Sequence, residues 1–74
     1  MPEPLVVDVR PDIAAGEEPF KKIMSAVGAL APEQSLVLIN SFEPTPLYAV
    51  MQQRGFSHET VRTDDGAWQV TFSR

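Results

Sequence analysis

The segment DVRPDIAAGEEPFKKI, residues 8–23, decides the fold because it leads from a strand into a helix. We predict a loop over residues 11–16 and a helix that starts near Glu17 or Glu18. Pro19 then falls in the first turn of the helix, where a missing N–H costs nothing. The acidic pair at the start of this helix complements the positive end of its dipole.

The residues on either side of this segment extend it to a strand–helix–strand unit. Residues 5–9, LVVDV, are short, rich in β-branched side chains and bounded by prolines, which is typical of a strand. The helix presents one apolar stripe at helical spacing, made of Phe20, Ile23, Met24, Val27 and Leu30. Residues 35–40, SLVLIN, predict a second strand that is apolar on both faces and therefore central in its sheet.

The C-terminal half predicts a second helix and a hairpin. Thr45 suits the N-cap of the helix, Pro46 its first position and Gly55 its left-handed stop. Its buried side comprises Leu47, Val50 and Met51, with Tyr48 at the margin. Strands are predicted at 56–63 and 67–73, joined by the turn Asp64-Asp65-Gly66. The inward side chains of the last strand are Trp68, Val70 and Phe72.

The order β-α-β-α-β-β predicts a single domain, residues 1–74, with the fold of an α/β two-layer sandwich. Strands joined by one helix should run parallel with right-handed crossovers, so both helices lie on one face of a four-stranded mixed sheet. The other face stays bare. Val6 projects onto it, and we expect a small apolar patch there and a monomer or a weak homodimer.

Composition excludes several classes of function. The 74 residues carry a net charge of −4, and their basic residues are scattered, which argues against a nucleic-acid site. No apolar run is long enough to cross a bilayer, and the start MPEP lacks the features of a signal peptide. The chain has no cysteine, so it has no thiolate metal site and no thiol nucleophile. We expect a cytoplasmic protein without cofactor, membrane or nucleic-acid partner.

Short motifs resemble the TusA/SirA-like family of small bacterial sulfur carriers over nearly the whole chain. DVR (8–10) is similar to the step that ends the family's first strand, and APEQS (31–35) to the turn before its second strand. GEEP (16–19) falls on the Cys-Pro-x-Pro motif that opens the family's first helix. Pro19 matches the last proline, whereas Gly16 stands at the position of the sulfur-carrying cysteine.

A closer resemblance is to a TusA-related group of uncharacterised domains without that cysteine, the DUF2249-like group. Its LxxxxSLxLxN and xPxPLY segments look like residues 30–40 and 43–48. Persulfide transfer requires a thiolate, which glycine cannot supply. Sulfur carriage of the family's kind is therefore excluded for this chain acting alone.

Two polar pairs follow the first two strands, at the edge where open α/β sheets usually bind ligands. Asp8 and Arg10 either form an anion or metabolite site with helix amides or form an ion pair that holds the loop. Asn40 and Glu43, with Ser41 between them, either complete the same site or serve as capping and turn residues. We take Asp8, Arg10, Asn40 and Glu43 as the candidate binding residues, and a neutral or mixed-charge group as the expected ligand.

Other polar residues have structural explanations. His58 is the only histidine, and a metal site needs several convergent ligands, so we predict a surface residue and no metal. An enzymatic interpretation would use Asp8 or Glu43 as a general base, but no catalytic constellation accompanies them, and we predict that the domain is not an enzyme. Two hypotheses remain: a non-catalytic module that binds a protein or a small metabolite, or a regulatory or scaffolding component of a sulfur-relay or redox system.

Overall fold

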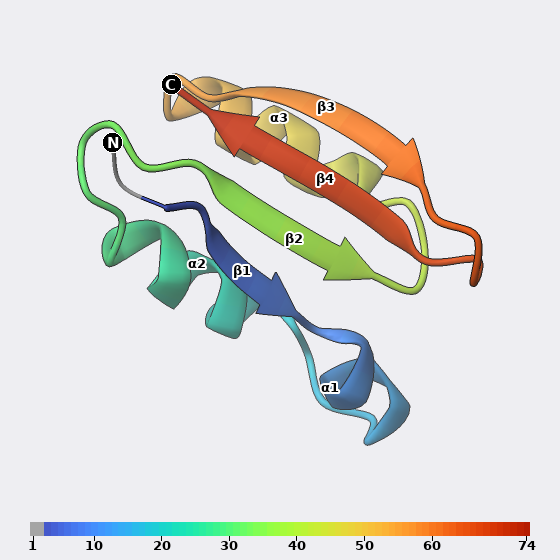
Figure 1. Cartoon of the computed structure of the whole chain (residues 1–74). Helices are drawn as coiled ribbons and strands as arrows, with labels where there is room; N and C mark the ends of the chain where they lie inside the picture. Colours follow the sequence, from blue (N-terminus) through green and yellow to red (C-terminus); the bar gives the residue numbers. More distant parts are fainter. Residues whose placement is uncertain (1–2) are drawn as a thin grey trace.

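The computed structural model describes residues 3–74. The first two residues of the predicted domain, which begin the MPEP segment, lie outside the described residues. Figure 1 shows a four-stranded sheet, two helices behind it and a short helix beyond the end of the first strand. In chain order the elements are β1 (Leu5–Asp8), α1 (Arg10–Ala14), α2 (Phe20–Gly28), β2 (Leu36–Asn40), α3 (Thr45–Gln53), β3 (Ser57–Arg62) and β4 (Trp68–Ser73).

The sheet has the strand order β1-β2-β4-β3. β1 runs parallel to β2, with Val7 opposite Leu38, and β4 runs antiparallel to both of its neighbours. β2 thus has a neighbour on each side, which confirms the central position predicted from its two apolar faces. β1 and β3 form the edges.

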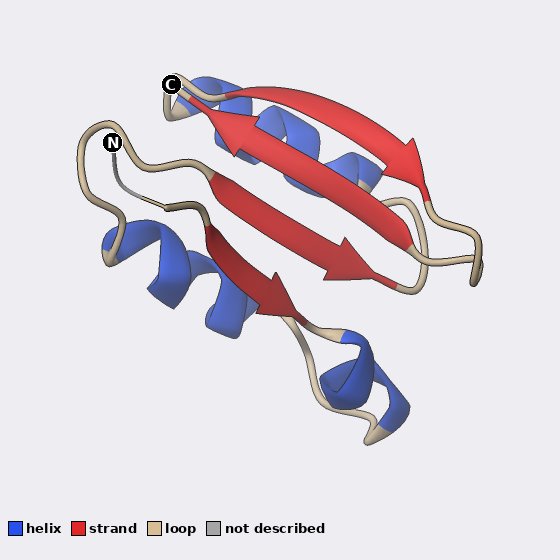
Figure 2. Ribbon diagram, viewed as in Figure 1, coloured by secondary structure: helices blue, strands red, loops and turns tan. Residues whose placement is uncertain are grey.

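Both longer helices cover the same face of the sheet (Figure 2). Alternate strand residues project to this face, and the most deeply buried of them are Leu36, Leu38, Val70 and Phe72. Ile23 of α2 packs into this core, as do Leu47 and Met51 of α3. The α/β two-layer sandwich with helices on one face is therefore confirmed.

The other face of the sheet is bare and carries both apolar and polar residues. Val6 and Val61 expose 58% and 51% of their surface, near opposite edges of the sheet. Between them lie half-buried residues of the central strands, the apolar Val37 and Ile39 and the polar Gln69 and Thr71.

Residues 11–16 form mostly a helix, so the predicted loop is wrong. α1 carries Pro11 and Asp12 in its first turn, where a missing N–H is harmless and a carboxylate suits the helix dipole. The Ile13 N–H donates to the Val9 carbonyl at 3.0 Å. A helix of five residues is too short to produce the apolar periodicity by which a helix is recognised in a sequence.

α2 begins at Phe20 and not near Glu17 or Glu18, and Pro19 is its N-cap residue. The start is delayed because Gly16 and Glu17 still belong to the end of α1. The Gly16 N–H donates to Ile13 at 3.0 Å and the Glu17 N–H to Asp12 at 2.9 Å, the two bonds of a Schellman stop. Gly16 has the left-handed φ of +78° that this stop requires.

The position of Gly16 leads to a testable prediction about the missing cysteine. In Gly16→Cys, the thiol should titrate near its ordinary pKa of about 8.5, because it lies at the end of α1 and not at the start of α2. A Cβ at this position meets open space, so only the positive φ opposes the change, and we expect a stability loss of about 1 kcal/mol. Ala15→Cys, at an exposed neighbour with φ −83°, is the matched control and should keep full stability. A thiol pKa far below the ordinary value in Gly16→Cys alone would show that residue 16 faces the start of α2.

The second helix begins one residue earlier than predicted. Pro44 is the N-cap and Thr45 the first helical residue, and no side chain caps the helix. The Thr45 N–H instead donates to the Glu43 carbonyl at 2.9 Å, so the bend itself satisfies this amide. Gly55 ends the helix with φ +87°, as predicted.

The predicted hairpin is confirmed, with each strand one residue shorter at one or both ends. Gly66 has φ +83°, and the Thr63 N–H donates to the Ala67 carbonyl at 2.9 Å across the turn. Val70 and Phe72 are fully buried, whereas Trp68 is only half-buried. The Arg62 guanidinium lies 5.1 Å from the centre of the Trp68 ring and covers it where the core ends. Over residues 3–74, no helix has the length and apolar character to cross a membrane.

Candidate ligand pocket at the start of α2 and α3

A pocket of about 250 Å³ lies where β2 ends and where α2 and α3 begin. The parallel strands end at this edge, and the crossover helices start from it (Figure 1). We refer to it as the Asn40 pocket, and its lining comprises Glu18, Pro19, Phe20, Ile23, Asn40, Phe42, Pro44, Pro46 and Leu47.

Asn40 is the polar residue at the bottom of this pocket. It is the last residue of β2 and lies opposite Trp68, so its side chain points to the helix-covered face like that of Leu38. Only 1% of its surface is exposed. Among residues 3–74, it is the one polar residue that is buried. Burying an amide is unfavourable unless its hydrogen-bonding groups are satisfied.

One half of the Asn40 amide is satisfied and the other is free. Asn40 Oδ1 accepts a hydrogen bond from the Ser41 backbone N–H at 2.8 Å. Since that N–H can only donate, the bond fixes which end of the amide faces Ser41. The Nδ2 group forms no hydrogen bond to any residue between 3 and 74, and it stays in contact with solvent, since Asp12 Oδ2 is the buried side-chain atom without a partner in this part of the chain. The pocket therefore offers a donor without an acceptor.

The walls of the pocket are stiff and its rim is apolar. Pro19, Pro44 and Pro46 restrict the backbone around it. Phe20 and Phe42 stand at the mouth and expose 45% and 50% of their surface. The first turn of α2, which begins with Phe20, has no side-chain cap, so its free amides add donors beside the pocket.

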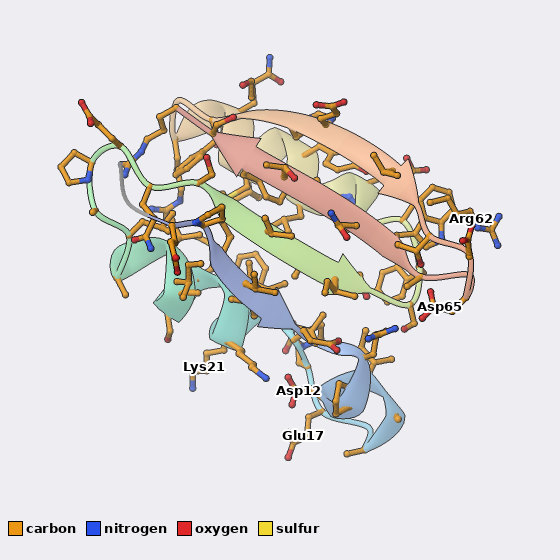
Figure 3. All side chains as sticks on the ribbon, in the orientation of Figure 1. Asp12, Glu17, Lys21, Arg62 and Asp65 are labelled. Atoms are coloured by element: carbon orange, nitrogen blue, oxygen red, sulfur yellow. The ribbon has the colours of Figure 1, made fainter. Side chains whose placement is uncertain are left out.

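Asp8 and Arg10 form the structural ion pair that was one of the two predicted alternatives. Arg10 Nη2 lies 2.8 Å from Asp8 Oδ2, and Arg10 Nε and the Arg10 backbone N–H each lie 3.0 Å from Asp8 Oδ1. Arg10 Nη1 also reaches Asp65 Oδ2, in the β3–β4 turn, at 3.1 Å. Figure 3 labels Asp65 at this end of the sheet. Arg10 thus holds the start of α1 to the hairpin.

The electrostatics of this cluster agree with its geometry. The side-chain and backbone hydrogen bonds from Arg10 lower the pKa of Asp8, and the same side-chain bond raises the pKa of Arg10. The Thr63 hydroxyl, which donates to Asp65, and the Ala67 N–H lower the pKa of Asp65. The guanidinium is engaged on two sides, and its side chain is still 38% exposed, so solvent weakens each contact.

Glu43 and His58 lie near Tyr48, on the side of α3 that faces β3. Tyr48 Oη is 3.3 Å from Glu43 Oε2 and 2.7 Å from Thr60 Oγ1. The exposed His58 ring stacks on the Tyr48 ring, with 3.9 Å between centroids and 6° between planes. Burial raises the pKa of Tyr48. These contacts attach α3 to the edge strand.

A third ion pair holds α1 against α2. Lys22 Nζ lies 2.9 Å from Asp12 Oδ2, an ion-pair distance without the geometry of a hydrogen bond, and it donates to the Asp8 carbonyl at 3.3 Å. Figure 3 shows Asp12 and Glu17 close to α1 and Lys21 on α2.

The four predicted binding residues are therefore divided among three places: Asp8 and Arg10 beside the hairpin, Asn40 in the pocket, and Glu43 beside Tyr48. The predicted edge contains the pocket, but its lining residues Phe20, Phe42 and Pro44 were not among the predicted residues. The sequence carries a signal for Phe42 and Pro44 in FEPTP (42–46), where an aromatic residue precedes two prolines. Within residues 3–74, no three His, Cys, Asp or Glu side chains gather as a metal site would require.

Comparisons with known proteins place the chain in a family. Residues 6–74 match the family model described as "Uncharacterized conserved protein (DUF2249)". No curated protein and no solved structure matches the chain. Because the match spans nearly the whole domain, the chain belongs to the DUF2249 family of uncharacterized conserved proteins.

Proposed function

We propose that this domain is a non-catalytic binding module and that the Asn40 pocket is its ligand site. The observation that carries the proposal is the Asn40 amide, which is 1% exposed and has an Nδ2 group without a protein partner in a mostly apolar pocket. Nδ2 has no protein acceptor within the described residues, and a ligand acceptor placed against it would form a hydrogen bond that contributes about 1 kcal/mol.

The charged residues near this edge support binding rather than catalysis. Arg10 is engaged by Asp8 and Asp65, and Asp8 has a lowered pKa, which makes it a poor general base at neutral pH. Glu43 contacts Tyr48 and not the pocket floor. The chain has no cysteine to carry sulfur, so the module would act by recognition alone.

The proposal is tested by NMR with two small probes and the isotopically labelled full chain. N-acetyl-L-leucinamide combines an apolar side chain with carbonyl acceptors, and we expect it to shift the Asn40 side-chain amide together with the backbone amides of Phe20, Ile23 and Phe42. N-acetyl-glycinamide has the same carbonyls without the apolar group and should leave these signals in place.

The two probes together separate binding at the pocket from general hydrogen bonding. Shifts confined to the turn 64–66 or to the bare face of the sheet would contradict the proposal. Equal shifts with both probes would show that the apolar lining contributes nothing.

A further inference from the structure

The size of the Asn40 pocket limits what it can hold. Sites for drug-sized small molecules usually measure roughly 300–1,000 Å³. At about 250 Å³, this pocket is below that range and suits one or two residues of a peptide better than a nucleotide or a flavin. The half-exposed Phe20 and Phe42 continue the apolar surface beyond the pocket, as expected where a longer chain lies across it.

The hydrogen-bonding groups of the pocket select the kind of residue. Nδ2 of Asn40 is a free donor, whereas the carbonyls of Pro19 and Pro44 already accept from Ile23 and Leu47 at 3.0 Å. A ligand residue without an N–H of its own leaves no donor to be satisfied against this mostly apolar lining. Proline has a carbonyl acceptor and an apolar ring and lacks the N–H. Grooves with aromatic walls bind proline-rich segments in this way.

The charge around the mouth selects the neighbours of that residue. Glu18 lines the pocket, and Glu43 lies between the lining residues Phe42 and Pro44. Lys21 is the only cation in this group, since Lys22 is paired with Asp12 and Arg10 with Asp8 and Asp65. An acidic mouth favours a ligand that carries Lys or Arg beside the anchor.

We propose that the Asn40 pocket binds a proline-containing, basic segment of a partner protein. The proline ring fills the space between Phe20 and Phe42, and the carbonyl before or after it accepts from Asn40 Nδ2. Flanking Lys or Arg side chains face Glu18. This inference rests on the proposed function, because it assigns an occupant to the same pocket.

Three peptides of one length test the assignment by NMR titration of the full chain. We expect acetyl-Arg-Pro-Pro-Leu-Pro-Arg-amide to shift the Asn40 side-chain amide, with a Kd on the order of 1 mM or tighter. Its counterpart with every proline replaced by alanine should bind about tenfold more weakly. Its counterpart with both arginines replaced by glutamate should also bind more weakly, and that difference should shrink at high salt.

Two exposed residues give a matched pair of variants. Phe42 and Val61 expose 50% and 51% of their surface, so truncation of either should leave the fold intact. Phe42→Ala should weaken binding of the proline peptide about tenfold, as for an anchor at the rim of a pocket. Val61→Ala, at the far edge of the sheet, should have no effect.

The outcomes separate this inference from the proposed function. If the alanine peptide binds as tightly as the proline peptide, the assignment to proline is wrong. If the glutamate peptide binds as tightly as the arginine peptide, the assignment of Lys or Arg beside the proline is wrong. If N-acetyl-L-leucinamide binds and no peptide does, the pocket is a ligand site and its occupant is not a proline segment. If neither the leucinamide nor any peptide shifts the pocket, the proposed function fails as well.

Discussion

Replacement of Asn40 by leucine is expected to weaken binding of N-acetyl-L-leucinamide about tenfold, because it removes the one buried donor that faces the ligand. The fold should tolerate the change. Leucine has a similar size and suits the mostly apolar lining of the pocket. The lost hydrogen bond to the Ser41 N–H offsets part of that gain, and Ser41 is exposed, so water replaces it. We therefore expect an unchanged or slightly higher melting temperature.

The control for this variant is Gln69→Leu. Gln69 is a half-buried amide on the bare face of the sheet, opposite Ile39, so the same kind of change occurs far from the pocket. Calorimetry should show unchanged binding for Gln69→Leu and weaker binding for Asn40→Leu. If both variants bind like the original chain, Asn40 does not donate to the ligand.

Replacement of Arg10 by alanine is expected to lower the melting temperature and leave binding at the Asn40 pocket unchanged. The change removes the contacts to Asp8 and Asp65, and with them the link between the start of α1 and the β3–β4 hairpin. Arg10→Lys should recover part of the loss, since an ammonium keeps the charge but lacks the planar fork. Arg54→Ala, at an exposed position after α3, is the control and should leave the melting temperature unchanged.

The effect of Arg10 should depend on pH in a defined direction. The folded chain holds the pKa values of Asp8 and Asp65 below their ordinary value of 3.8, so folding favours the ionised carboxylates. Their contribution is present above pH 3.8 and is lost as the pH falls through the lower values of the folded state. The difference in melting temperature between the original chain and Arg10→Ala should therefore be constant near neutral pH and narrow below pH 3.8. A difference that grows in acid would contradict the assignment.

Self-association through the bare face of the sheet remains a prediction. Val6, Val37 and Ile39 adjoin there, and Gln69 and Thr71 separate them from Val61. Weak self-association is the expected behaviour.

The sequence by itself determined the elements whose patterns are long or whose turn residues are distinctive. β2 is apolar on both faces and proved central, Gly55 ended α3, and Asp64-Asp65-Gly66 formed the hairpin. These signals are local: side-chain alternation, a positive φ and a turn that few residue types can adopt. The sequence also excluded sulfur carriage by this chain, because a thiolate cannot be made without cysteine.

Tertiary structure decided the site. Asp8, Arg10, Asn40 and Glu43 follow two neighbouring strands, and topology alone placed all of them at one edge. Which of them faces a ligand depends on contacts that sequence spacing does not encode. Asp65, 55 positions beyond Arg10 in the chain, accepts a hydrogen bond from the Arg10 guanidinium. Glu43 accepts one from the Tyr48 hydroxyl. Asn40 alone of the four lines the pocket, because it ends β2 on the face of the sheet that the helices cover.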